Sequence, residues 1–140
     1  MRDMPSPTRM LLGAGAVLLL IQLIPVTRDN PDDRRGPGAS PAVEAILRRA
    51  CYDCHSHETV WPWYSRIAPV SWLIAWDVRE GRTTFNLSNL QDISEETQVK
   101  VRAAARKVVE DGEMPPWYYR PLHPDARLTE QDLAVLRTWK

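Results

Sequence analysis

The sequence predicts an all-α protein in which a small helical domain follows one apolar N-terminal helix. No stretch alternates apolar and polar residues for long enough to indicate a strand. Several segments instead repeat apolar residues at helical spacing and begin at residues that favour helix starts. The 140 residues carry a formal net charge of +0, and 44% of them are hydrophobic. This composition suits one compact domain and provides no overall charge that would recruit nucleic acid.

The first element is apolar, and residues 1–27 are predicted to form a signal anchor or transmembrane helix. No charged residue occurs from Met10 to Val26, a length near the lower limit for crossing a bilayer as a helix. A cleaved secretory signal is the alternative, but small residues are missing at a suitable site, and at "GASP" Pro41 would follow the cut. Residues 28–41, rich in Pro, Gly and charge, are interpreted as a polar linker.

Residues 42–140 are predicted to form the helical domain. Four helices are expected, each bounded by residues that favour helix ends. They run from Pro41 through the CYDCH stretch, from Ser71 to Gly81, from Ser94 to Gly112, and behind Thr129, where Asp132 completes a pattern resembling a capping box.

Both cysteines of the chain lie in the stretch CYDCH. Positions i, i+3 and i+4 of a helical turn point the same way, so the thiols of Cys51 and Cys54 converge with the imidazole of His55. A haem presents two vinyl groups on neighbouring pyrroles and an iron at its centre. Two such thiols can form thioethers while the imidazole reaches the iron. The CxxCH pattern therefore predicts one covalently attached haem, haem c.

Other roles of the paired cysteines fit the sequence less well. A zinc site requires four ligands, and neither a second cysteine pair nor an H-x(3–5)-H pattern is present. A thioredoxin-like redox pair belongs beside a βαβ unit. A disulfide between residues this close closes a loop too small to stabilise much. His57 lies too near His55 to reach the opposite face of a haem and is expected at the surface.

The stretch CYDCHSHETVWPWYSRIAPVSWLIAWDVREGR, followed by FNLS and DGEMPPWYY, closely resembles the bacterial haem-binding domain family of small membrane-tethered c-type cytochromes. The likeness includes the N-terminal segment ending in LIPVTRDNP, and the motifs CxxCHS, PWYxxIAPxSW, EGR and GxMPP occur in the family's order. It implies a cytochrome c-like domain in which Cys51 and Cys54 hold the porphyrin, His55 is the proximal ligand and Met114 the sixth ligand. The family often has a histidine around Trp76 or Asp77, where this sequence has none.

The sequence itself also favours Met114 as the sixth ligand. The other three methionines lie in or before the apolar segment, and two prolines directly after Met114 stiffen its loop. The alternatives are a core methionine that fills a gap and ligation by His123 from a proline-bounded loop. Axial His and Met fill both iron positions, which favours electron transfer over catalysis, so the protein is not expected to be an enzyme.

Aromatic residues and arginines complete the predicted cofactor site. The aromatic side chains expected to wall the macrocycle are Trp61, Trp63, Tyr64, Trp72, Trp76 and Trp117. Membrane-interface anchoring is their alternative role, although such a belt is expected nearer the apolar helix. Arg66 and Arg82 are candidates to pair with the haem propionates, with a solvated surface position as the alternative.

We therefore interpret the chain as a mono-haem c-type cytochrome, a single-electron carrier tethered to the cytoplasmic membrane by a single pass. The arginines flanking the apolar segment leave its orientation open. The family resemblance implies a haem domain on the periplasmic, extracytoplasmic side. Expected partners are the membrane and membrane-bound or periplasmic redox proteins, with no nucleic acid. The alternative is a haem-based sensor or a peroxidase-like enzyme with a displaceable sixth ligand, and a third possibility is one module of a larger redox complex.

Overall fold

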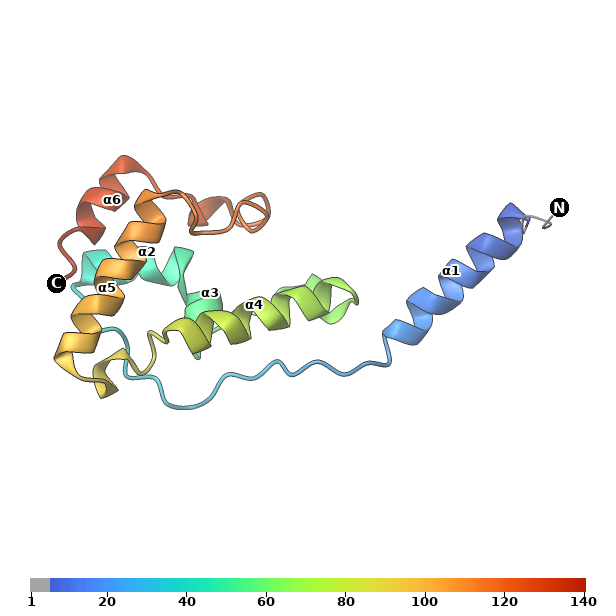
Figure 1. Cartoon of the computed structure of the whole chain (residues 1–140), viewed down its shortest axis with the longest axis horizontal. Coiled ribbons are helices and arrows are strands. Elements are labelled where there is room, and N and C mark those ends of the chain that lie inside the picture. The colour runs from blue at the N-terminus through green and yellow to red at the C-terminus, as the bar shows by residue number, and fades with distance from the viewer. Residues whose placement is uncertain (1–5) are drawn as a thin grey trace. The chain divides into compact units, whose positions relative to one another are not determined.

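A computed structural model describes residues 6–140, and within that range its regular secondary structure is entirely helical (Figure 1). The α-helices are Pro7–Ile21 (α1), Pro41–Ala50 (α2), Tyr52–His55 (α3), Val70–Thr84 (α4), Glu95–Glu110 (α5) and Glu130–Leu136 (α6). Short 3-10 helices occupy Trp63–Arg66 (η1), Leu90–Asp92 (η2) and Pro124–Ala126 (η3). The all-α prediction is confirmed. The first five residues of the predicted 1–27 segment lie outside the described residues.

Contacts divide the chain into two compact units. The first comprises the chain up to Arg28 together with residues 61–76. Within it, the Ala68 backbone N–H donates to Gln22 Oε1 at 2.9 Å, and the Arg28 guanidinium donates to the Ser65 carbonyl oxygen at 3.0 Å. The second unit comprises residues 29–60 and 77–140. The boundaries predicted at residues 27 and 41 remain a prediction.

Helix α1 is shorter than the predicted membrane-spanning segment. It begins with Pro7 in its first turn and ends at Ile21, four residues before Pro25. Its 15 residues extend about 22 Å at the α-helical rise, against about 30 Å for the hydrocarbon core of a bilayer. Over residues 6–140, no helix combines the length and the apolar character needed to cross a membrane. The prediction of a transmembrane helix is therefore not supported.

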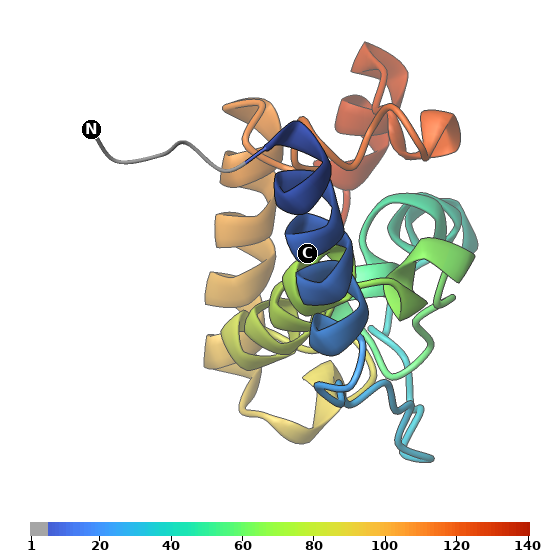
Figure 2. The ribbon, with the colours of Figure 1, turned by 90° about the vertical axis from the view of Figure 1, so that its right-hand side faces the viewer.

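The hydrophobic core of the second unit joins α2 and α6 to the segment that follows α4. Its buried side chains are Val43, Ile46, Leu47, Tyr52, Leu87, Leu90, Leu136 and Trp139. Helix α6 contacts both α2 and α5, and the three helices gather together in Figures 1 and 2. Val101, Ala105 and Val109 of α5 are partly buried against this core. Both cysteines and His55 belong to this unit.

Local capping signals place two of the predicted helices correctly. The Ser94 side chain accepts a hydrogen bond from the Thr97 N–H at the start of α5, and Gly112, with φ of 75°, lies just beyond its end. Thr129 and Asp132 form a reciprocal capping box at the start of α6. The expected helices over 94–112 and behind Thr129 are confirmed.

Two helix ends differ from the sequence-based expectation. The helix that begins at Pro41 ends at Ala50, because Cys51 leaves helical geometry with φ of −127°, and a separate short turn then forms α3. Helix α4 does not end at Gly81 but continues to Thr84. A close approach of Gly81 to the backbone of Cys54 explains why a glycine occupies an interior position of this helix.

Arg49 fastens the C-terminal part of the second unit to α2. Its guanidinium donates to the carbonyl oxygens of Asp125 at 2.6 Å and Arg127 at 3.2 Å, and it pairs with the Asp132 carboxylate at 2.5 Å. The hydrogen bond from Arg49, the hydrogen bonds from Thr129 and the charge of Arg49 together lower the pKa of Asp132 to about 2. The ion pair thus joins α2 to the capping box of α6.

Replacing Asp132 with alanine is expected to lower the free energy of unfolding by about 1–2 kcal/mol, because the capping box and the ion pair are lost together. The folded-state pKa lies below the usual value near 4, so this contribution is present above about pH 4 and fades as the pH falls toward about 2. Urea unfolding of both proteins across this range measures it. Glu130→Ala, in the same helical turn, is the control, and a difference that persists at pH 2 would contradict the assignment.

Candidate cofactor site

A single tight turn carries both cysteines and His55. The Cys51 carbonyl oxygen accepts hydrogen bonds from the N–H of Cys54 at 3.2 Å and of His55 at 2.9 Å. The three residues therefore keep the spacing of one helical turn, although the helix is interrupted at Cys51. The following residue, Ser56, closes the turn because its hydroxyl donates to the Tyr52 carbonyl oxygen at 2.8 Å.

The two thiols are half-buried and form no disulfide. Burial raises the pKa of Cys51 to about 12, and burial together with the neighbouring carboxylates of Asp77 and Asp53 raises the pKa of Cys54 to about 12. Thiol exchange proceeds through the thiolate, which this environment disfavours, so the redox-pair alternative loses support. The two side chains are suited to reacting as neutral thiols. Among residues 6–140, no group of three or more His, Cys, Asp or Glu side chains could hold a metal ion, so the zinc alternative loses support as well.

His55 is held by the segment that follows α4. Only 9% of the residue is exposed, its Nδ1 lies 3.2 Å from the Phe85 carbonyl oxygen, and its ring stacks on the Phe85 ring at 4.1 Å. A carbonyl oxygen only accepts hydrogen bonds, so Nδ1 bears the proton and Nε2 presents a lone pair to a metal. Burial lowers the pKa of His55, which favours the neutral ring that a metal ligand requires.

Gly81 allows α4 to run directly against the cysteine turn. A Cβ atom at this position would lie 2.4 Å from the carbonyl oxygen and 2.9 Å from the carbonyl carbon of Cys54. Both neighbours are backbone atoms, which cannot move aside as a flexible side chain can. Gly81 is thus required by a close approach and not by the helix end that the sequence suggested.

Arg82 is held by backbone and side-chain oxygens around the cysteine turn. Its Nε donates to the Ser56 carbonyl oxygen at 2.8 Å, and Nη2 donates to Asn30 Oδ1 and Thr59 Oγ1, both at 2.9 Å, and to the Asp29 carbonyl oxygen at 3.0 Å. These contacts fasten residues 56–59 to the stretch around residue 30. The predicted pairing of Arg82 with a haem propionate would have to compete with these acceptors.

His57 lies in the interior, so the expectation of a surface position is wrong. The residue is 8% exposed, its Nδ1 lies 2.6 Å from Asp33 Oδ1, and its Nε2 accepts from the Asn86 side chain at 2.6 Å. Its backbone N–H donates to Ser88 Oγ at 2.8 Å. Residues of the linker and of the FNLS stretch thus provide hydrogen-bond partners for both ring nitrogens of His57. These residues are distant in sequence and meet only in the folded chain.

Two tyrosines fasten the loop that carries Met114, one to the cysteine turn and one to α4. The Tyr119 hydroxyl donates to Asp53, between the two cysteines, at 2.6 Å, and the Tyr118 hydroxyl donates to Asp77 of α4 at 3.2 Å. Met114 is 41% exposed, and its backbone N–H donates to the Val108 carbonyl oxygen at 3.2 Å. The structure thus joins this loop to Asp53 of the cysteine turn and to Asp77 of α4.

His123, the alternative sixth ligand, packs within the same loop region. Its ring stacks on the Tyr119 ring at 3.8 Å, and its Nδ1 lies 3.1 Å from the Tyr119 carbonyl oxygen. Sequence reasoning missed Phe85, Asp53 and Tyr119 as supporting residues. The FNLS and WYY stretches contained them, but no spacing rule connects either stretch to the cysteines.

Most of the aromatic residues predicted to wall the cofactor belong to the first unit. These are Trp61, Trp63, Tyr64, Trp72 and Trp76, and Arg66 lies there as well. Trp63 is 74% exposed, whereas the indole N–H groups of Trp61 and Trp72 are buried without an acceptor among the described residues. The cofactor contacts of Trp63 and Trp72 remain a prediction. Trp117, also predicted, lies in the second unit.

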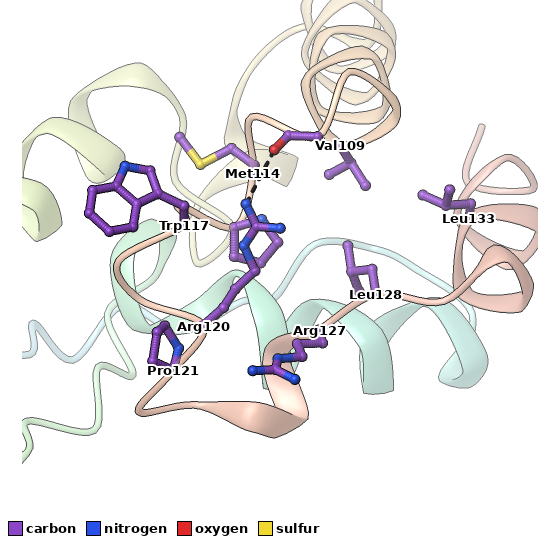
Figure 3. A pocket seen from close by; sticks show the side chains of 10 residues that line it. Val109, Met114, Trp117, Arg120, Pro121, Arg127, Leu128 and Leu133 are labelled. Carbon is purple, nitrogen blue, oxygen red and sulfur yellow. Dashed lines mark hydrogen bonds between the residues drawn. The ribbon is translucent and has the colours of Figure 1, made fainter.

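A cavity of about 550 Å³ opens beside Met114 in the second unit (Figure 3). Figure 3 shows Met114 and Trp117 at one end and Leu133 at the other, with Arg120 between them. Volumes of about 300–1,000 Å³ are typical of small-molecule and cofactor sites. The cavity therefore adjoins the predicted sixth ligand, but its lining does not include Cys51, Cys54 or His55.

Comparison with known families shows the family to which the chain belongs. A family model described as a haem-binding domain matches residues 16–140, most of the chain. No curated protein and no solved structure shows a significant match. The match of the family model includes the cysteine turn, α4 and the Met114 loop. The chain therefore belongs to the haem-binding domain family.

Proposed function

We propose that the protein is a mono-haem c-type cytochrome that carries single electrons. Family membership supports a haem cofactor. The proposal adds that the haem is joined covalently to Cys51 and Cys54, with His55 and Met114 as axial ligands. The observation that carries it is the single turn on which two half-buried neutral thiols accompany an imidazole whose Nδ1 proton faces the Phe85 carbonyl oxygen.

The residues present fit this cofactor. Each neutral thiol can add across one vinyl group, forming a carbon–sulfur bond while the thiol hydrogen passes to the other vinyl carbon. The Phe85 carbonyl holds the His55 ring in one orientation and leaves its Nε2 lone pair for iron. Tyr119 ties the Met114 loop to the same turn. The bound haem would supply iron that alternates between the ferrous and ferric states, accepting and releasing one electron.

Covalent attachment is tested by intact-mass measurement on full-length protein made in a host that matures c-type cytochromes. The mature protein should exceed its polypeptide mass by one haem and retain pigment after denaturation in acid. Cys51→Ala and Cys54→Ala should each retain one thioether, and the double variant should release its haem on denaturation. A wild-type protein with only the polypeptide mass and no pigment would refute the proposal.

One observation favours a second function. Met114 is 41% exposed on a loop, and an exposed ligand can be displaced by a small molecule. A haem sensor or a peroxidase-like enzyme would use such an open position. Carbon monoxide added to the reduced protein at neutral pH separates the two functions, because rapid and complete binding indicates a labile site, whereas an electron carrier with firmly bound Met114 resists it.

We further propose that the haem domain works outside the cytoplasm, close to the membrane. Support comes from the exposed apolar side chains of the N-terminal segment, among them Leu11, Leu12, Leu19 and Leu23, and from the resemblance to membrane-tethered cytochromes. Membrane-bound or periplasmic redox proteins are the partners this location offers. Fractionation of cells producing the full chain tests it, with protein recovered from membranes as the expected result and protein in the cytoplasm as the contradicting one.

A further inference from the structure

The stretch from η1 into the first half of α4 exposes a row of large apolar side chains. Val70, Leu73 and Trp76 are exposed and follow one another at three-residue intervals in α4, so they lie along one face of the helix. Trp63 of η1 and Ile67, directly behind η1, are exposed as well. These five side chains form the apolar row of the first unit. Large exposed apolar patches mark contacts with a protein, a ligand or a membrane.

The apolar row belongs to the same compact unit as the apolar helix α1. Gln22, at the end of α1, forms a reciprocal pair with the Ala68 backbone. The Ala68 N–H donates to Gln22 Oε1 at 2.9 Å, and Gln22 Nε2 donates to the Ala68 carbonyl oxygen at 3.2 Å. The Arg28 guanidinium donates to the Ser65 carbonyl oxygen at 3.0 Å.

These contacts change the argument about the aromatic residues. Tryptophans that anchor a protein at a membrane interface are expected beside its apolar helix. In the sequence, Trp63 and Trp76 lie far behind the apolar segment. In the fold, residues 65–68 between them are hydrogen-bonded to the chain at the end of α1. The aromatic stretch therefore lies where an interfacial belt is expected.

The described residues of this unit carry positive charge only. Its charged residues within 6–28 and 61–76 are Arg9, Arg28 and Arg66, and neither range contains Asp or Glu. Arg66 is exposed on η1, and the described part of its unit offers no carboxylate to pair with it. Basic residues at a membrane surface attract anionic lipids. An apolar surface with arginines and without carboxylates is thus complementary to an anionic bilayer.

We propose that the apolar row is a membrane-contacting surface, which places its side chains among the headgroups of a bilayer while Arg66 faces lipid phosphates. The inference rests on the proposed location at a membrane and deepens it, but it does not depend on the haem. It assigns Trp63 and Trp76 to lipid and not to the walls of the cofactor site predicted from the sequence. Arg66 likewise binds lipid phosphate in place of a haem propionate.

Binding of the full-length protein to sedimented vesicles of phosphatidylcholine mixed with phosphatidylglycerol tests the inference. Trp63→Ser combined with Trp76→Ser should lower the partition coefficient roughly tenfold, because two large apolar side chains are lost from the membrane interface. Trp117→Ser is the matched control, because Trp117 is 76% exposed, against 74% for Trp63, but belongs to the second unit. The haem content and the optical spectrum of the double variant should equal those of the wild type.

Arg66→Gln tests the electrostatic part separately. It should weaken binding to the mixed vesicles roughly fivefold and leave binding to phosphatidylcholine alone unchanged.

The possible failures are distinguishable. Wild-type protein that sediments with the vesicles, while the double variant binds no more weakly than Trp117→Ser, would overturn the inference and leave the proposed location standing. A double variant that binds normally but has an altered haem spectrum would also overturn it and assign the two tryptophans to the cofactor site. Wild-type protein that remains in solution with both kinds of vesicle would refute the proposed location itself.

Discussion

Gly81→Ala is expected to lower the free energy of unfolding by about 1–3 kcal/mol and to reduce haem attachment. Overpacking a close contact costs about this much, and here the new Cβ would lie 2.4 Å from the Cys54 carbonyl oxygen. Helix α4 would have to separate from the cysteine turn, displacing Cys54 and His55 relative to Phe85. Denaturant unfolding and the haem-to-protein ratio measure the two effects.

The direction of the change in unfolding free energy shows whether the close contact at Gly81 exists. Alanine stabilises an open helix interior by about 0.5–1 kcal/mol relative to glycine, so without the contact Gly81→Ala would be stabilising. Gly13→Ala in α1 is the matched control, because no atom lies within 4 Å of a Cβ built there. An unchanged or raised stability of Gly81→Ala would show that α4 does not approach the turn closely.

The parts of the fold that sequence reasoning found are those determined by neighbours in the chain. The start of α5 is specified by Ser94 with Thr97, and the start of α6 by Thr129 with Asp132, all within one turn. The cysteine turn belongs to the same class, because its chemistry depends on residues three and four positions apart. Local rules therefore suffice to predict an attachment point for a haem without any tertiary information.

The errors arose where distant segments meet. His57 was expected at the surface because it lies too near His55 to reach the opposite face of a haem, yet Asp33 and Asn86 bond its two ring nitrogens in the interior. Gly81 was interpreted as a helix end because glycine commonly occupies that position, whereas contact with Cys54 requires it inside α4. Neither the polar partners of His57 nor the contact of Gly81 with Cys54 can be identified from the spacing of residues in the sequence.

The supporting residues of the site were missed for the same reason. The Phe85 carbonyl oxygen that faces His55 lies 30 residues away in sequence, and Tyr119 lies 66 residues from Asp53. Neither Phe85 nor Tyr119 belongs to a sequence pattern that would indicate a role beside the cysteines. The geometry around a metal ligand is set by such contacts, so the sequence predicts candidate ligands but not the groups that orient them.

Met114→Ala is expected to abolish thioether ligation of the iron. Ferric wild-type protein should show the weak long-wavelength charge-transfer band of a sulfur ligand, and the variant should lack it entirely. The midpoint potential should also fall, because His/Met ligation raises the potential relative to other axial pairs. The loop itself should persist, since Tyr118 and Tyr119 hold it independently of the methionine side chain.

Two control variants complete this test. Met10→Ala removes an exposed methionine of α1 and should leave the band intact. His123→Ala should also leave it intact, because that ring is stacked on Tyr119 and is not expected at the iron. A wild-type spectrum of the bis-imidazole kind that changes in His123→Ala and not in Met114→Ala would transfer the ligand assignment to His123. The tyrosine-anchored loop would then position the ligand nine residues further along the chain.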